Sequence, residues 1–413
     1  MTAGGQAVAG HRVGLRRLAA LLAGRASFRL LLYGSAAVLA LAWTAQDFNA
    51  YSAAVGAVNW LGMLIQAGTE KAALKLVPRA RRTKDQILGT LRAVTLYVPL
   101  PFTAVAVAAV VFAPGATATL YLLAIAYYVA LGCGMLGVAL HRALERYNRD
   151  TAYFALLGLG MAGMAGLAFA LRVPPEGYLC GLLALTTALN LGLLPGLPRA
   201  RANAGVRRVL AGTAVLMGAA DVLHSAQVGV LFLELALTPH ATGSGHLYLV
   251  TLGWTFAGSV IYTVQRIYQP RLSARIANGG TAAAKVLARR VTGAVTWLSA
   301  AWLLSAGSAV AITRPSGPFA LVALLVTLLP IHTLMNYGVF ILENTDGTDL
   351  RASARAAIIG LAVVAALGAV AIPLFGTAGA IVALGANELA VSLTAGRTSS
   401  LRARRGDAAA RPT

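Results

Sequence analysis

Asp221, His224 and Ser225 are polar residues that lie close together inside an apolar stretch running from about residue 208 to 238. Their spacing is i, i+3 and i+4, so in a helix the three side chains share one face. A carboxylate inside a membrane helix is costly unless it faces a cavity or a partner. The spacing predicts a cavity-lining site where Asp221 takes up H⁺ or Na⁺ beside His224, a proton partner; the alternative is an interhelical hydrogen bond that fixes packing.

A second polar pair, Asn387 and Glu388, lies near the centre of the apolar residues 378–396. Carboxylate and amide oxygens are suitable ligands for a hard cation, and a carboxylate can also carry a proton. We expect the pair either to complete a cation or proton site with Asp221 or to have a structural role.

His332 and Asn336 follow Pro330 within the apolar residues 319–342. A proline at membrane depth kinks a helix and frees a backbone carbonyl, so the histidine beside it could either titrate in a cavity or pack as an ordinary core residue. The candidate cavity or substrate residues are Asn59, Ser225, Gln227, His332 and Asn336.

Basic residues gather where the apolar stretches end. Phosphate groups pair with lysine and arginine, so these residues could capture an anionic lipid head group, although a preference of basic residues for the cytoplasmic side predicts the same pattern. No lysine or arginine falls at an expected bilayer midplane, so such capture would take place at the ends of the helices. The candidate residues at the cytoplasmic mouth are Lys71, Lys75, Arg79, Arg92, Arg266 and Arg271.

Sequence motifs exclude several classes of enzyme. The chain has no Walker A sequence, GxSxG elbow, HExxH helix or DxxxD-type motif, so we expect neither bound ATP nor catalysis within it. Cys133 and Cys180 lie in apolar stretches without partners at metal-ligand spacing, and we interpret them as small buried residues. We expect no metal and no cofactor beyond a coupling ion.

The elements that must position these residues are membrane helices. Of 413 residues, 58% are hydrophobic and 11% are charged, far fewer charges than a soluble domain carries. Stretches of about 20 apolar residues predict an all-α polytopic membrane protein with about twelve transmembrane helices. We place these helices at 28–46, 51–69, 92–113, 118–140, 151–171, 177–197, 208–238, 246–266, 291–313, 319–342, 356–374 and 378–396.

The distribution of the 34 Lys and Arg residues supports this count. All but Arg172 and Arg314 fall in the two termini or in alternate connections, and positive residues stay on the cytoplasmic side. Both termini are therefore expected in the cytoplasm. The net charge of +21 is explained by loops that face an anionic leaflet, and we expect no nucleic acid partner.

A basic connection after the sixth helix divides the chain into two lobes of six helices. We expect a cytoplasmic arm at 1–27, an N-lobe at 28–200, a C-lobe at 201–396 and a disordered cytoplasmic tail at 397–413. A weak repeat aligns Tyr51 at the start of the second helix with Tyr248 at the start of the eighth, which suggests duplicated lobes.

Several motifs resemble one transporter superfamily. Asp47–Tyr51, Gly68–Lys71 and Pro78-Arg79 are similar to the opening of polysaccharide and O-unit flippases of the multidrug/oligosaccharidyl-lipid/polysaccharide (MOP) superfamily, and Phe375–Ile381 with Asn387–Leu389 is similar to its last helix. The resemblance implies two lobes that alternate in access, as in the multidrug and toxin extruders (MATE) and the lipid II flippase.

The resemblance also implies a sodium site among helices 7, 11 and 12, which maps onto Asp221, Asn387 and Glu388. The predicted eleventh helix has no polar residue from Ile358 to Pro373, so it offers no side chain as the third contributor. Protonation is therefore the simpler coupling chemistry.

Three functions remain open. The first is a flippase of the cell membrane that moves a polyprenyl-linked glycan, as a monomer, with membrane lipids, glycosyltransferases and a glycan polymerase as partners. The second is a multidrug or cation antiporter of the same fold. The third is an integral membrane glycosyltransferase that uses Asp47, which requires a large external loop that the short connections do not provide.

Overall fold

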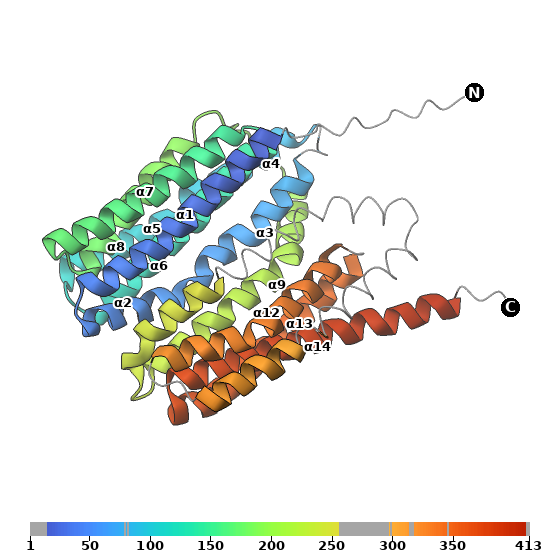
Figure 1. Cartoon of the computed structure of the whole chain (residues 1–413). Helices are drawn as coiled ribbons and strands as arrows, with labels where there is room; N and C mark the ends of the chain where they lie inside the picture. The colour runs from blue at the N-terminus through green and yellow to red at the C-terminus, as the bar shows by residue number, and fades with distance from the viewer. Residues whose placement is uncertain are drawn as a thin grey trace.

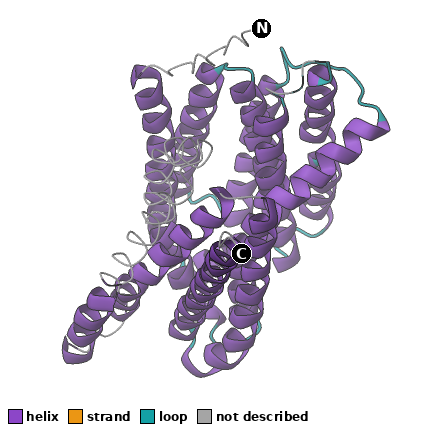
Figure 2. Ribbon diagram, turned by 90° about the vertical axis from the view of Figure 1, so that its right-hand side faces the viewer, coloured by secondary structure: helices purple, strands orange, loops and turns teal. Residues whose placement is uncertain are grey.

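The computed structural model describes residues 15–77, 80, 82–255, 297, 300–313, 318–344 and 347–409. Helices make up almost all of this part of the chain, and none of it forms a strand (Figure 2). The helices are α1 (Leu15–Ala42), α2 (Ala45–Val58), α3 (Trp60–Leu76), α4 (Lys84–Tyr97), α5 (Pro99–Phe112), α6 (Thr117–Ala143), α7 (Tyr147–Leu171), α8 (Pro175–Leu193), α9 (Ala204–Ala236), η1 (Ala241–Gly243), α12 (Pro318–Asn344), α13 (Gly347–Phe375) and α14 (Thr377–Ala409). Residues 244–255 and 300–313 are also helical.

The helices confirm the predicted membrane architecture. Within the described residues, eight helical spans are long and apolar enough to cross a membrane, and shorter apolar helices cover 27–42, 300–313 and 320–333. Two predicted spans are each built from two helices, because α2 passes into α3 at Asn59 and α4 passes into α5 at Pro99. The predicted span 246–266 is described only as far as residue 255. This chain is therefore a multi-pass membrane protein.

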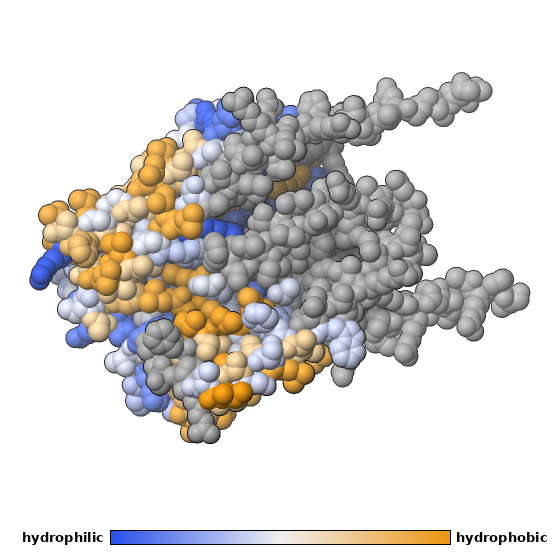
Figure 3. All heavy atoms as spheres, viewed as in Figure 1, coloured by the Kyte–Doolittle hydropathy of each residue, from blue (hydrophilic) through white to orange (hydrophobic). Residues whose placement is uncertain are grey.

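The helices pack as two groups (Figure 1). In the N-lobe, α6 packs against α3, α5 and α8, while α1 packs against α7. In the C-lobe, α13 packs between α9 and α14, and α12 packs against α14. Large apolar side chains remain exposed on the outer helix faces, as Figure 3 shows in orange and as Phe102, Val105 and Leu159 illustrate. Such faces are suited to lipid.

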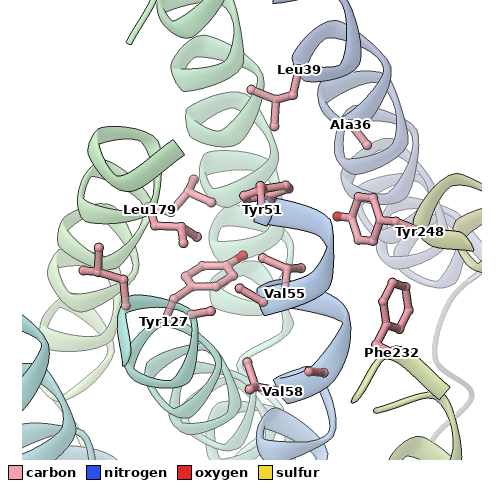
Figure 4. Close-up of a cluster of buried hydrophobic side chains, with 14 of the residues drawn as sticks. Ala36, Leu39, Tyr51, Val55, Val58, Tyr127, Leu179, Phe232 and Tyr248 are labelled. Atoms are coloured by element: carbon pink, nitrogen blue, oxygen red, sulfur yellow. The ribbon is translucent and has the colours of Figure 1, made fainter. Parts of the chain in front are cut away.

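The two lobes are joined where the helices α2 and α3 run beside α9, an arrangement that we call the interlobe seam. Glycines allow the close approach: a Cβ on Gly218 would lie 2.6 Å from the Cα of Gly68, and a Cβ on Gly229 would lie 2.8 Å from the Ala57 carbonyl oxygen. Figure 4 shows α2 with Tyr127 and Leu179 of the N-lobe on one side and Phe232 and Tyr248 of the C-lobe on the other.

The two ends of the bundle differ in charge. We call the end with the α3–α4, α6–α7, α8–α9 and α12–α13 connections the basic end, since the basic connections lie there. The start of α1 and the end of α14 lie toward the same end in Figure 1. The other end carries the α1–α2, α5–α6, α7–α8 and α13–α14 connections. At this opposite end the rings of Tyr51 and Tyr248, which the weak repeat aligned, meet at 6.0 Å across the lobes.

Two local expectations differ from the structure. The helix α14 continues through residues 397–409, where the composition suggested a disordered tail. Alanine and arginine are both strong helix formers, which explains how a segment without an apolar face continues a preceding helix. The helix α1 is one continuous element from Leu15 to Ala42, so it begins within the expected cytoplasmic arm at 1–27 and continues into the first predicted span.

Candidate functional site

A buried carboxylate, imidazole and indole meet in the C-lobe. Glu388 on α14 accepts a hydrogen bond from Trp254 Nε1 at 2.9 Å, and its same oxygen, Oε1, lies 2.6 Å from His332 Nδ1 on α12. The rings of Trp254 and His332 are 4.7 Å apart. Glu388 is 2% exposed, and its second oxygen, Oε2, has no hydrogen-bond partner among the described residues.

This geometry is suited to proton exchange. Burying a charged carboxylate is costly unless hydrogen bonds or a counter-charge compensate it. A proton shared between Glu388 Oε1 and His332 Nδ1 would make the pair either neutral or a short ion pair, and Oε2 is placed to take up a further proton or a cation.

The local structure of α12 supports this placement. Pro330 has no N–H to bond the carbonyl of Val326 one turn earlier. The Trp302 indole donates to that carbonyl instead, at 3.0 Å. The prolyl residue inside α12 is thereby accommodated two residues before His332.

A second buried group of polar atoms lies beside Glu388. Asn387 Nδ2 donates to Gln227 Oε1 on α9 at 2.8 Å, and Gln227 Nε2 donates to the backbone carbonyl of Ala357 on α13 at 3.2 Å. Gln227 and Asn387 are 2% and 1% exposed. His224 Nδ1 approaches Gln227 Oε1 at 3.5 Å, at the limit of a hydrogen bond.

These contacts join α9, α13 and α14, the three helices that the family resemblance implied. The contribution from α13 is the backbone carbonyl of Ala357, which a search of this helix for polar side chains could not detect. Gly360 makes room for the group, because a Cβ there would overlap Asn387 Oδ1. That oxygen is buried and has no hydrogen-bond partner within the described parts of the chain.

Asp221 lies outside this C-lobe site. Its Oδ2 is 2.8 Å from Lys71 Nζ, across the interlobe seam, with the two side chains 24% and 21% exposed. About 22 Å of helix separate Asp221 from the end of α9 at Ala236 and about 25 Å separate it from the start at Ala204, so it lies near the middle of this 33-residue helix.

A further ion-pair network lies next to Lys71. Arg142 on α6 contacts Glu70 Oε1 on α3 and Asp150 Oδ2 on α7, both at 2.8 Å. Gln66 donates to the other Glu70 oxygen at 2.8 Å. Sequence reasoning missed this group, although the signal was present: Glu70 and Asp150 are carboxylates at an end rich in lysine and arginine.

The remaining predicted residues are dispersed. Asn59 stands at the α2–α3 junction with a buried Oδ1 that has no partner among described residues, and Ser225 is half-buried on α9. Lys75 is exposed in the last turn of α3, and Arg92 is half-buried on α4. Asn336 lies on α12, but its side chain is outside the described part, as are the residues Arg79, Arg266 and Arg271.

Comparison with solved structures identifies the fold. The chain matches an inward-facing multidrug resistance MATE family transporter of the MOP superfamily with a TM-score of 0.63, at 11% identity over 96% of this chain and 99% of that one. It matches the lipid II flippase MurJ in an inward closed conformation with a TM-score of 0.62, at 12% identity over 91% and 86%.

A MOP superfamily transporter from Pyrococcus furiosus gives a TM-score of 0.59, at 11% identity over 94% of both chains. No protein-family model and no curated protein matches the sequence. All three structures are membrane transporters with nearly the length of this chain. The two lobes, the seam between them and these matches together show that this protein has the fold of the MOP superfamily transporters.

Proposed function

We propose that this protein translocates a lipid-linked oligosaccharide or polysaccharide precursor across the cytoplasmic membrane by alternating access of its two lobes. The observation that carries the proposal is the seam. Among the described residues, the partly exposed ion pair Lys71–Asp221 and glycine contacts join α3 to α9 there, and lobes joined in this way could rock without breaking a large buried polar network. The basic end, which we assign to the cytoplasm, suits capture of an anionic lipid head group.

Coupling belongs to the buried C-lobe site in this proposal. Glu388, with His332 against one oxygen, would exchange a proton as the lobes move, and Asn387 with Gln227 would hold α9, α13 and α14 around it. Na⁺ is the alternative ion, because the consecutive residues Asn387 and Glu388 each have a buried oxygen, Oδ1 and Oε2, without a hydrogen-bond partner in the described structure. Because the charge of Lys71 compensates that of Asp221, Asp221 would contribute to the contact between the lobes at the seam and not to ion coupling.

A multidrug or cation antiporter is the second candidate, and the match to the MATE transporters supports it as strongly as the match to MurJ supports a flippase. Both functions need a coupling site, so Glu388 does not distinguish them. A glycosyltransferase is less well supported, because the matched structures are transporters. We further propose that the chain works as a monomer, beside the glycosyltransferases and polymerase that make and consume such lipids.

Reconstitution in liposomes tests the proposal. A fluorescent polyprenyl diphosphate-linked disaccharide and a cationic dye are offered separately under an imposed pH gradient, and accessibility to a membrane-impermeant quencher reports translocation. We expect gradient-dependent translocation of the lipid, with loss of at least about tenfold in Glu388→Gln and little change in Glu234→Gln, a half-buried C-lobe carboxylate on α9. Transport of the dye alone would establish the antiporter instead.

A further inference from the structure

A cavity of about 880 Å³ opens at the opposite end of the bundle from the basic connections. Both lobes contribute to it: the start of α2 and of α6 from the N-lobe, and the end of α9 with the residues that follow it from the C-lobe. Its volume is typical of a pocket for a small molecule. The C-lobe site around Glu388 contributes no residue to the wall of this cavity.

The polar groups in this wall are all neutral or weakly basic. They comprise two amides, three hydroxyls and one imidazole, from Gln46, Asn49, Thr117, Tyr121, Thr242 and His246. No aspartate, glutamate, lysine or arginine lines the described wall. The nearest carboxylate in sequence, Asp47, instead accepts a hydrogen bond from the Thr44 hydroxyl at 2.8 Å.

The apolar part of the wall contains small and aromatic side chains. Ala40, Ala53 and Phe48 line the cavity, and the Phe48 ring is 6.3 Å from the ring of Tyr248. Behind it lies the buried tyrosine cluster in which Tyr51 contacts Tyr248 and Tyr178. The cavity thus offers flat aromatic and methyl surfaces edged by amides and hydroxyls.

This combination fits an uncharged sugar. A sugar ring has C–H faces that pack on aromatic and methyl groups, and a rim of hydroxyls that pair with amides and hydroxyls. Lysine and arginine are the usual side-chain partners of a phosphate, and a carboxylate is a common charged partner of an organic cation. Neither is present in the described wall.

We propose that this cavity binds the uncharged sugar portion of the transported lipid at the exit side. The inference rests on the proposed function and names the substrate chemistry of its outer site. The cavity adjoins the place where the lobes touch: Gly245 N donates to Asn49 Oδ1 at 2.8 Å. A sugar that engaged Asn49 would compete for this contact and so favour parting of the lobes at that end.

Saturation-transfer NMR on the protein in lipid nanodiscs tests the proposal, since nanodiscs avoid glycoside detergents. The probes are chitotriose, maltotriose and tetraphenylphosphonium. We expect saturation transfer to at least one trisaccharide, with Gln46→Ala and Thr117→Ala each weakening binding about fivefold, the effect of one lost hydrogen bond. Thr313→Ala is the matched control, because Thr313 is an exposed threonine at the end of the helix 300–313 and does not line the cavity.

The other outcomes overturn the inference. Binding of tetraphenylphosphonium that depends on Gln46 and Thr117, or binding of neither trisaccharide, excludes a sugar site here. The liposome assay distinguishes failure of this inference from failure of the proposed function. Translocation of the lipid-linked disaccharide without trisaccharide binding would support the flippase function and exclude this sugar site. If the wild-type protein translocates only the dye, the flippase itself is wrong.

Discussion

Exchanging the charges of Lys71 and Asp221 should preserve the contact between α3 and α9, whereas changing either one alone should weaken it. The pair is 2.8 Å long, and its side chains are 21% and 24% exposed. Exposed pairs contribute about 0–1 kcal/mol, while removing one partner of a fully buried pair costs about 3–5 kcal/mol. At this partial burial we expect a coupling energy of about 1–2 kcal/mol.

The measurement is a double-mutant cycle of Lys71→Asp, Asp221→Lys and the double variant. Each single variant places two like charges together at the seam, so its apparent melting temperature in nanodiscs should fall by a few degrees. The double variant should recover most of that loss. Tryptophan fluorescence during heating reports the transition for all four proteins.

Lys75→Asp is the control for this cycle. Lys75 lies one turn further along α3 and is exposed, so the same change of charge there should leave the melting temperature nearly unchanged. If the double variant melts no higher than the two singles, or if Lys75→Asp destabilises as strongly as Lys71→Asp, the ion pair does not hold the seam.

Three other predictions address the packing and the topology. Gly218→Val should destabilise the seam by about 2–3 kcal/mol through overpacking against Gly68, whereas Gly212→Val on the same helix has open space and should cost no more than about 1 kcal/mol in unfolding experiments. Asp150→Asn removes one of two carboxylates from Arg142 and should lower stability by about 2–3 kcal/mol, while Asp85→Asn on α4 should have little effect. Reporter fusions after Gly115 and Ser244 should both score outside; a cytoplasmic signal from either would invert the proposed orientation.

The helices were predictable because membrane spans depend on local quantities. About 20 apolar residues suffice to indicate each one, and the alternation of basic connections checks the count. The same reasoning identified Glu388, His332, Asn387 and Gln227 separately, since each is an uncompensated polar residue in an apolar stretch. Whether these side chains come into contact depends on the rotation and the register of α9, α12 and α14 relative to one another. No local sequence pattern indicates that packing.

The parts that sequence reasoning missed have physical causes of two kinds. The Ala357 carbonyl belongs to the backbone, and every residue has one, so its type carries no signal. The pairing of Asp221 with Lys71 could not be predicted either, because α9 is about 50 Å long and exceeds the hydrocarbon thickness, so the sequence alone does not fix its depth or the neighbours of its residues.

The ion pairs of the consecutive residues Glu70 and Lys71 determine with which lobe the helix α3 should move. Neighbouring side chains on a helix point about 100° apart, so Glu70 faces Arg142 in the N-lobe while Lys71 faces Asp221 in the C-lobe. The N-lobe contact is the stronger, because Arg142 bridges two carboxylates and Asp150 is only 1% exposed, whereas the Lys71 and Asp221 side chains are 21% and 24% exposed. If the lobes part at the basic end, α3 should therefore move with α6 and α7, and the break should occur between α3 and α9.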